Sequence, residues 1–229
     1  MDGAVNLYRD NALFADHLVQ SPRLAPFFET PHDTASLLVA APERCERPLT
    51  DGDLDALAAF NTLPFSDAEA VRAQTSRLAD PRSLCVVTGQ QAGLLLGPLY
   101  TVVKAIHAIR LARRLAEATG RPAVPVFWIA SEDHDWDEVC EVRWNDARGE
   151  RQRFALDLPP GMEGHSVGEV PLDRAALRGL IERLTVTLPE TEFRAPLFGL
   201  LDEAFAQSDT AGALFRHLLL RLLQPQGLV

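Results

Sequence analysis

The stretch LCVVTGQQAGLLLGPLYTVVKAIHAIRLARRLAEATGRPAVPVFWIASEDHDWD, residues 84–137, decides the fold. It begins at 84–87 with a short apolar run that contains β-branched residues. This run predicts a strand buried on both faces, as in a parallel sheet. Cys85, inside that strand, is predicted to be a small buried side chain. A loop at 88–97 with glycines at every fourth position follows, and this change of pattern predicts a turn out of the strand.

A long helix and a second strand complete the unit. The helix is predicted to run from Pro98, at the first helical position, to about Ala118, with Gly120 beyond its end. Its apolar stripe is predicted to consist of Leu99, Val102, Val103, Ile106 and Ile109. A second buried strand is predicted at 123–129, so that strand, helix and strand form a βαβ unit with parallel strands. The predicted fold class is therefore α/β.

Outside this unit, residues 1–48 are predicted to form an irregular arm, and the later residues a β-hairpin and five helices. Two segments, VCEVRWND (139–146) and ERQRFALDL (150–158), flank a turn and predict a β-hairpin. Helices are predicted at 51–60, 67–80, 172–187, 192–207 and 210–223, with Asp51 and Ser66 as the N-caps of the first two. The last residues, QPQGLV, have the pattern of an entry to a strand. Because a sheet of two or three strands is a poor independent fold, the chain is predicted to be the N-terminal portion of a longer protein.

Composition limits the class of protein. The chain has 229 residues, of which 47% are apolar and 24% charged, and its formal net charge is -10. It has no run of lysine and arginine, which argues against a nucleic-acid-binding module. It has no stretch of about 20 apolar residues that could span a membrane, no signal peptide at the N-terminus and no CxxC pair among its three cysteines. These features predict a cytoplasmic protein and argue against nucleic acid and membranes as partners, but they do not exclude small anionic ligands.

The loop after the first predicted strand is a candidate binding site. Ligands of open parallel sheets bind outside the carboxyl ends of the strands, so the loops at 88–97 and 130–137 should face one crevice. In the first loop, Gln90 and Gln91 offer amide donors and acceptors, and Gly93 allows close approach of the backbone to a ligand. The loop contains neither a Walker A motif nor GxGxxG, so it has no nucleotide fingerprint. The alternative interpretation is a tight turn with no ligand.

Two polar residues near the start of the predicted helix are further candidates. Tyr100 and Lys104 are four positions apart and therefore share one face of the helix. Both lie within two turns of the glycine loop, so they are placed to contact an anion or a polar substrate. The alternative interpretation is a solvated helix face.

The second loop carries consecutive ionisable side chains. We name it the SEDHD loop after its residues, Ser131, Glu132, Asp133, His134 and Asp135. The repulsion between its charges must be offset by solvent, a cation or hydrogen bonds. In one interpretation the carboxylates bind an amino group or a sugar hydroxyl, with His134 as general acid or base. A divalent metal site and a solvated acidic turn are the alternatives, and the spacing does not decide between them.

The same residues resemble a known family. TGQQAGLLLGPLYTVVKAI (88–106) followed by PVFWIASEDHDWDEV (125–139) is similar to the bacillithiol-biosynthesis family BshC, whose assigned role is the addition of cysteine. The matching elements are GQQ-G, GPLYT, Lys104 and PVFW-ASEDHD, in this order and with matching spacing. The resemblance is strong from about Thr88 to Glu138 and weaker over the rest of the chain.

The resemblance implies a Rossmann-like parallel-sheet core, similar to class I nucleotidyltransferases, with an inserted hairpin and helical connecting region. The implied division is an N-terminal arm and helices at 1–80, a core βαβ unit at 81–138, an insertion at 139–209 and a return to the core at 210–229. Family members are longer, so the core is expected to be incomplete in this chain, and a homodimer is expected only for the full-length protein. The implied substrates are cysteine and glucosaminyl-malate. The cofactor stays open, with ATP or ADP implied by the resemblance alone.

The predicted function is that of a ligase that joins the carboxyl group of cysteine to the amine of glucosaminyl-malate. Gln90 and Gln91 are predicted to orient the substrate, and Lys104 to hold a carboxylate or phosphate. Asp133 or His134 is predicted to handle the attacking amine, and no residue is assigned to a metal. The alternatives are a metal-dependent hydrolase that acts through the SEDHD loop and a non-catalytic ligand-binding fragment.

Overall fold

The computed structural model describes residues 11–19, 21–27 and 49–229. The chain groups into two compact units, residues 1–43 and 44–229. The described elements of the first unit are the short helix α1 (Ala12–Leu18) and the 3-10 helix η2 (Pro22–Phe27), and neither contains a buried residue. Within the described ranges, no helix is long and apolar enough to cross a membrane. All strands within the described ranges belong to the second unit.

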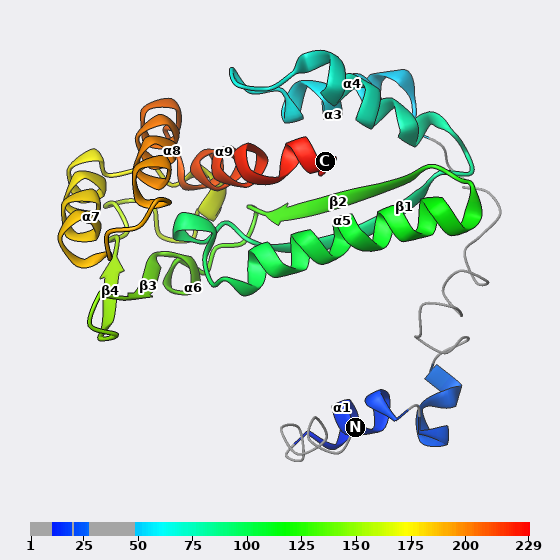
Figure 1. The fold of residues 1–229 in the computed structure, drawn as a ribbon, viewed down its shortest axis with the longest axis horizontal. Helices are drawn as coiled ribbons and strands as arrows, with labels where there is room; N and C mark the ends of the chain where they lie inside the picture. Colours follow the sequence, from blue (N-terminus) through cyan, green and yellow to red (C-terminus); the bar gives the residue numbers. More distant parts are fainter. Residues whose placement is uncertain (1–10, 20, 28–48) are drawn as a thin grey trace. The chain divides into compact units, whose positions relative to one another are not determined.

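A parallel pair of strands and the helix that connects them lie at the centre of the second unit (Figure 1). β1 (Leu84–Gln91) pairs with β2 (Ala123–Ala130) over the full length of both strands. The connecting helix α5 (Tyr100–Thr119) packs against both strands and ends at Gly120, which has a left-handed conformation with φ of 64°. The predicted βαβ unit with parallel strands is therefore confirmed.

The first strand is longer than predicted. It includes Gly89, Gln90 and Gln91, which the sequence pattern assigned to the loop. A glycine is required at position 89 because a Cβ atom there would lie 2.6 Å from the backbone oxygen of Trp128 on β2. The two glutamines are therefore held at fixed positions on a paired strand, and not on a free loop.

The two strands are not buried on both faces. Cys85 and Val87 are exposed and share one face of the sheet with Trp128, because Trp128 pairs with Gly89 and side chains alternate along a strand. The exposed fractions of Val87 and Trp128 are both 61%. The prediction of a buried Cys85 is wrong for the same reason: the described elements leave this face of the sheet partly uncovered.

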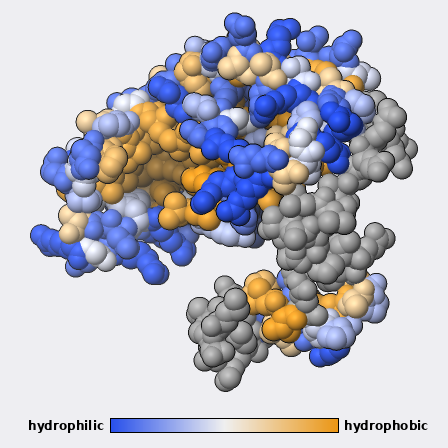
Figure 2. All heavy atoms as spheres, turned by 45° about the vertical axis from the view of Figure 1, so that its right-hand side comes forward, coloured by the Kyte–Doolittle hydropathy of each residue, from blue (hydrophilic) through white to orange (hydrophobic). Residues whose placement is uncertain are grey.

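The predicted apolar stripe of α5 is also wrong in part. Leu99, Val103 and Ile106 are exposed. The residues of α5 that are buried are mostly small and lie at helical spacing: Thr101, Ala105, Ala108, Ile109, Ala112 and Leu115. Small side chains allow a helix to pack closely on a sheet, so the larger ones lie outside. Figure 2 shows a broad hydrophobic area in a hollow on one face of the larger unit.

The remaining elements agree with the predicted pattern. β3 (Glu141–Asn145) and β4 (Arg151–Ala155) form the antiparallel hairpin. The helices are α3 (Asp51–Asn61), α4 (Ala68–Ser76), the short α6 (Trp136–Val139), which was not predicted, α7 (Arg174–Thr187), α8 (Arg194–Gln207) and α9 (Ala211–Leu223). The 3-10 helices are η3 (Arg77–Ala79), η4 (Leu94–Leu96), η5 (Val167–Glu169) and η6 (Gln224–Gln226). The N-cap of α3 is Thr50, one residue before the predicted Asp51. The N-cap of α4 is Asp67, one residue after the predicted Ser66.

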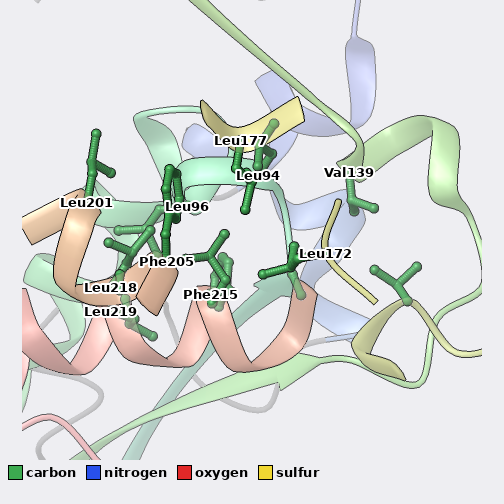
Figure 3. Packing of buried hydrophobic residues seen from close by; sticks show 14 of the residues in the cluster. Leu94, Leu96, Val139, Leu172, Leu177, Leu201, Phe205, Phe215, Leu218 and Leu219 are labelled. Atoms are coloured by element: carbon green, nitrogen blue, oxygen red, sulfur yellow. The ribbon is translucent and has the colours of Figure 1, made fainter. Parts of the chain in front are cut away.

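The main core lies between η4, α8 and α9 (Figure 3). Leu94 and Leu96 of η4 are buried against the same cluster as Phe205 of α8 and Phe215 of α9. Leu95 and Leu96 have positive φ values, 50° and 71°, which are unfavourable for residues with a side chain. Burial of the flanking leucines offsets this strain, so the glycine loop has a defined conformation.

The residues after α9 enter the sheet, as their pattern predicted. The backbone N–H of Val229 donates to the oxygen of Pro125 (3.0 Å), and the N–H of Phe127 donates to the oxygen of Val229 (2.8 Å). In parallel pairing, one residue forms hydrogen bonds with the two residues on either side of its partner on the neighbouring strand. Val229 therefore lies along β2, in register with Val126.

His217 of α9 makes the stability of this fold depend on pH. Its side chain is 2% exposed, and its Nε2 atom lies 3.5 Å from Glu203 with no hydrogen bond. Burial lowers the pKa of His217 below its ordinary value of 6.5, and this effect outweighs the opposing effect of Glu203. At pH values above about 6.5 this histidine is neutral in both the folded and the unfolded state, and the folded state has its full stability. As the pH falls below 6.5, the unfolded state takes up the proton more readily than the folded state, and the free energy of unfolding decreases. The free energy of unfolding should fall by up to about 1.4 kcal/mol per pH unit from this group.

Urea unfolding at pH 7.5 and pH 5.5 measures this effect. The wild-type protein should lose more stability between the two pH values than His217→Leu, which cannot titrate at this position. His107→Leu, a change of an exposed histidine on α5, should behave like the wild type. An equal loss in the wild type and in His217→Leu would contradict the assignment.

Candidate functional site

The two predicted loops meet at the carboxyl ends of β1 and β2. The amide Nε2 of Gln91, the last residue of β1, donates to Asp133 Oδ2 (3.2 Å) and to Glu138 Oε2 (2.5 Å). Asp133 belongs to the SEDHD loop, and Glu138 lies on α6 directly after it. The two loops therefore meet at one edge of the sheet, as the carboxyl-end rule predicted, but the two large hollows at the SEDHD loop are not lined by residues 88–97.

Lys104 extends this contact into a network. Its Nζ donates to the backbone oxygen of Gly89 and to Gln90 Oε1, both at 2.6 Å. The Nε2 of Gln90 then donates to Gln91 Oε1 (2.8 Å). One ammonium group is thus linked through two amides to two carboxylates. We call these five residues the glutamine network: Gln90, Gln91, Lys104, Asp133 and Glu138.

Tyr100 and Gly93 flank this network. The Lys104 ammonium lies 4.9 Å from the centre of the Tyr100 ring, and the ring is largely exposed. This contact confirms that Tyr100 and Lys104 share a helix face. A glycine is needed at position 93 for packing, because a Cβ atom there would lie 2.9 Å from Gly97 Cα. The N–H of Gly93 donates to Gln91 O. Close packing within the loop therefore accounts for Gly93 without any ligand.

Asp133 is held as a carboxylate by its own loop. Its Oδ1 accepts the backbone N–H groups of His134 (2.7 Å) and Asp135 (3.2 Å). The N–H of Asp135, followed by the amide of Gln91, lowers the pKa of Asp133 below its ordinary value. A carboxylate with a lowered pKa is a weak base, so Asp133 is better suited to hold an ammonium group than to remove its proton.

The SEDHD loop contributes to two hollows and not to a single cleft. Ser131 and Glu132 line a groove of about 690 Å³ beside β2 and α9. His134 and Asp135 line a second hollow of about 640 Å³ beside β4. The side chain of His134 is 78% exposed, and its Nδ1 lies 3.9 Å from Asp133 Oδ1. Asp133 itself lines neither hollow and lies at the point where the loop meets the glutamine network.

The short helix η5 fixes the conformation of the SEDHD loop. The backbone oxygen of Ser131 accepts the N–H of Gly168 (2.8 Å), and that of Asp133 accepts the N–H of Val167 (2.7 Å). A Cβ atom on Gly168 would lie 2.7 Å from Ser131 Cβ, and one on Gly212 would lie 2.8 Å from Gly168 Cα. Residues 37 and 44 positions apart in the sequence therefore pack closely against each other here.

Three residues that shape the site were not among those predicted: Glu138, Gly168 and Gly212. Glu138 lies within the resembling segment, at the end of a run of acidic residues, and this position was a usable indication. Nothing in the spacing of Gly168 or Gly212 indicates that they pack against each other. Among the described residues, no group of three or more His, Cys, Asp or Glu side chains is placed to hold a metal ion. The hydrolase interpretation therefore has no ligand set in the described ranges.

Comparison with known proteins identifies the family. The family model described as "Bacillithiol biosynthesis BshC, N-terminal Rossmann-like domain" matches residues 3–229. A protein of Halalkalibacterium halodurans named "Putative cysteine ligase BshC" is 35% identical over 98% of this chain and 39% of its own length. Proteins of the same name from Solibacter usitatus and Symbiobacterium thermophilum are 36% and 42% identical over 92% and 67% of this chain, and over 38% and 28% of their own lengths.

These matches confirm both the predicted resemblance and the Rossmann-like α/β fold class. The chain spans about two fifths of the length of the first of these relatives. The match to the family model covers nearly the whole chain, including the hairpin and the helices after the βαβ unit. The chain therefore belongs to the BshC family, as its N-terminal Rossmann-like domain.

Proposed function

We propose that this chain is the N-terminal part of a ligase that adds cysteine to the amine of glucosaminyl-malate. The observation that carries the proposal is the glutamine network, which joins the two loops that resemble the family at the carboxyl ends of the sheet. The relatives' name, putative cysteine ligase, supports cysteine ligation. The substrates, the cytoplasmic location and a homodimer of the full-length protein are parts of this proposal.

The network suits the binding of an amine. Asp133 and Glu138 present two carboxylates side by side, and only one ammonium group, that of Lys104, belongs to the same network. A protonated amine would add the missing positive charge at the carboxylates. Gln91 fixes both carboxylates from β1, so the amine would be positioned without movement of the loop.

The attack of the amine on a carboxyl group requires loss of a proton from the amine. Asp133 is a weak base because of its lowered pKa. His134 is exposed next to Asp133, and imidazole is the group that proteins use most often as a general base. We therefore assign Asp133 to binding of the amine and His134 to removal of its proton. Amide formation also requires an activated carboxyl group. ATP is implied only by the family resemblance, and no residue of this chain is assigned to it.

Asp133→Asn and His134→Gln test these roles in the full-length enzyme. His134→Gln should reduce the turnover of cysteine addition by about 10²–10⁴-fold, the usual contribution of a general acid or base. Asp133→Asn should reduce it by about 100-fold, the cost of misplacing the bound amine by about 1 Å. Glu117→Gln, which neutralises an exposed carboxylate on α5, is the matched control and should leave turnover unchanged. Turnover is measured by mass spectrometry of the product, and circular dichroism checks that each variant is folded. Wild-type turnover in both variants would remove these residues from the mechanism.

The non-catalytic alternative makes a different prediction. If the protein only binds its ligand, the full-length enzyme should form no product, although substrate should still bind. A chelator tests the hydrolase alternative, because a metal-dependent hydrolase would lose its activity on chelation.

A further inference from the structure

The groove of about 690 Å³ beside β2 contains charged groups that lack partners. It lies between the carboxyl half of β2, α9 and α3. Its walls are mostly apolar and include Leu57, Phe60, Trp128, Leu219 and Leu220. Ser131 and Glu132 connect it to the SEDHD loop. It is therefore adjacent to the glutamine network but separate from it.

Among the described residues that line this groove, Arg216 of α9 is the one with a positively charged side chain. Its Nε atom is buried and has no hydrogen-bond partner. The guanidinium group lies over the ring of Phe60, at 4.7 Å from the ring centre, and makes one long contact of 3.5 Å with the Phe60 backbone oxygen. No carboxylate of the described residues lies within ion-pair distance of it, whereas Arg221, one turn further along α9, pairs with Glu203. A charged group in apolar surroundings normally has a counter-ion.

Two solvent-exposed carboxylates line the same groove. Glu132 of the SEDHD loop and Glu169 of η5 make no salt bridge within the described part of the chain, with Arg216 or with any other cation. The groove thus presents an unpaired cation and unpaired anions that do not neutralise each other. A ligand that carries both a carboxylate and an ammonium group would supply a partner to each.

We propose that this groove binds the amino-acid substrate, with its α-carboxylate on Arg216 and its α-ammonium group near Glu132 and Glu169. This inference rests on the proposed function, and it assigns cysteine, and not the sugar, to this groove. The hydroxyls of a sugar need many hydrogen-bond partners, and the leucine and phenylalanine walls supply few of them. The short side chain of cysteine needs none and fits an apolar wall.

The assignment places the two substrates on opposite sides of the SEDHD loop. Glu132 faces the groove, while the next residue, Asp133, belongs to the glutamine network. The amine acceptor would be held at the network and the amino acid in the groove. Ser131 is held from behind by η5, so the loop between the two substrates is fixed.

A cycle of variants and ligands tests the inference. Calorimetric titrations use L-cysteine, L-cysteinamide, which lacks the carboxylate, and 3-mercaptopropionate, which lacks the amine, all under reducing conditions. Arg216→Gln should weaken the binding of L-cysteine at least tenfold and leave that of L-cysteinamide unchanged. Arg216→Lys should restore part of the affinity, because it keeps the charge but not the bidentate geometry. Arg110→Gln, which changes an exposed arginine on α5, is the control and should bind cysteine like the wild type.

Each outcome decides the question. Equal weakening of L-cysteine and L-cysteinamide in Arg216→Gln would show a structural role for Arg216 and overturn the inference. Unchanged binding of L-cysteine in Arg216→Gln would also overturn it, as would the absence of any binding to the wild type. If the full-length enzyme adds cysteine and Arg216→Gln leaves its KM for cysteine unchanged, the inference fails while the proposed function stands. If the full-length enzyme adds no cysteine, the proposed function itself fails.

Discussion

Replacement of Gly89 by alanine is expected to lower the free energy of unfolding by about 1–3 kcal/mol, the usual cost of forcing an extra methyl group into a packed site. The added Cβ atom would lie 2.6 Å from the backbone oxygen of Trp128 and 3.0 Å from its Cβ. The first of these atoms belongs to the backbone of the paired strand. The clash can therefore be relieved only if β1 and β2 move apart, which weakens the pairing at the end of the strand where the glutamine network begins.

Urea unfolding of Gly89→Ala and of Gly179→Ala measures this effect. Gly179 lies within α7, and a Cβ atom on it would meet nothing within 4 Å. Gly179→Ala should therefore stabilise the protein by about 0.5–1 kcal/mol, the difference in helix propensity between the two residues. The same chemical change is thus expected to have opposite signs at the two positions. Equal stabilities of the two variants would contradict the close approach of the strands at Gly89.

The regular part of the fold could be predicted because its patterns are local. The hairpin and the three helices after it follow from hydrophobic periodicity and turn residues, which do not depend on distant contacts. The end of β1 could not be predicted in this way. Gly-Gln-Gln has the composition of a loop, and only the pairing with Trp128, Ile129 and Ala130 makes it a strand.

The buried face of α5 shows a second limit. Leu99, Val103 and Ile106 are larger and more apolar than Ala105 and Ala108, so a hydrophobic pattern favours them as the buried face. The structure buries the alanines, because close packing on the two strands requires small side chains. A hydrophobicity pattern does not contain this requirement.

The candidate site also has a part that could be predicted from the sequence and a part that could not. The contact between the loops follows from the position of both loops at the carboxyl ends of neighbouring parallel strands, and it could be predicted. The separation of Glu132 from His134 into two hollows depends on which elements pack on each side of the loop. The unpaired Arg216 depends on the packing of α9 against α3, more than 150 residues away in sequence. Such contacts leave no local pattern.

Substitution of Lys104 by arginine is expected to reduce the proposed cysteine addition by the full-length protein by about 100-fold, the cost of a misplacement of about 1 Å in a catalytic site. Of the 22 lysine and arginine residues of the chain, Lys104 is the one lysine. Its compact ammonium group lies 2.6 Å from both Gly89 O and Gln90 Oε1. A planar guanidinium group is larger and cannot place a single nitrogen at this point. Gln90 would move, and Gln91 with it.

Arg110→Lys is the matched control, because it makes the reverse change at an exposed position of the same helix and should leave turnover unchanged. Lys104→Met should lose at least as much activity as Lys104→Arg, since it removes both hydrogen bonds. Both variants should remain folded, because the helix packs on the sheet through Ala105, Ala108 and Ala112 and not through Lys104. If Lys104→Arg kept full activity, any cation at this position would suffice, and the position of a single nitrogen between Gly89 and Gln90 would not matter. If only Lys104→Met lost activity, the charge and not the geometry would be the contribution of this residue.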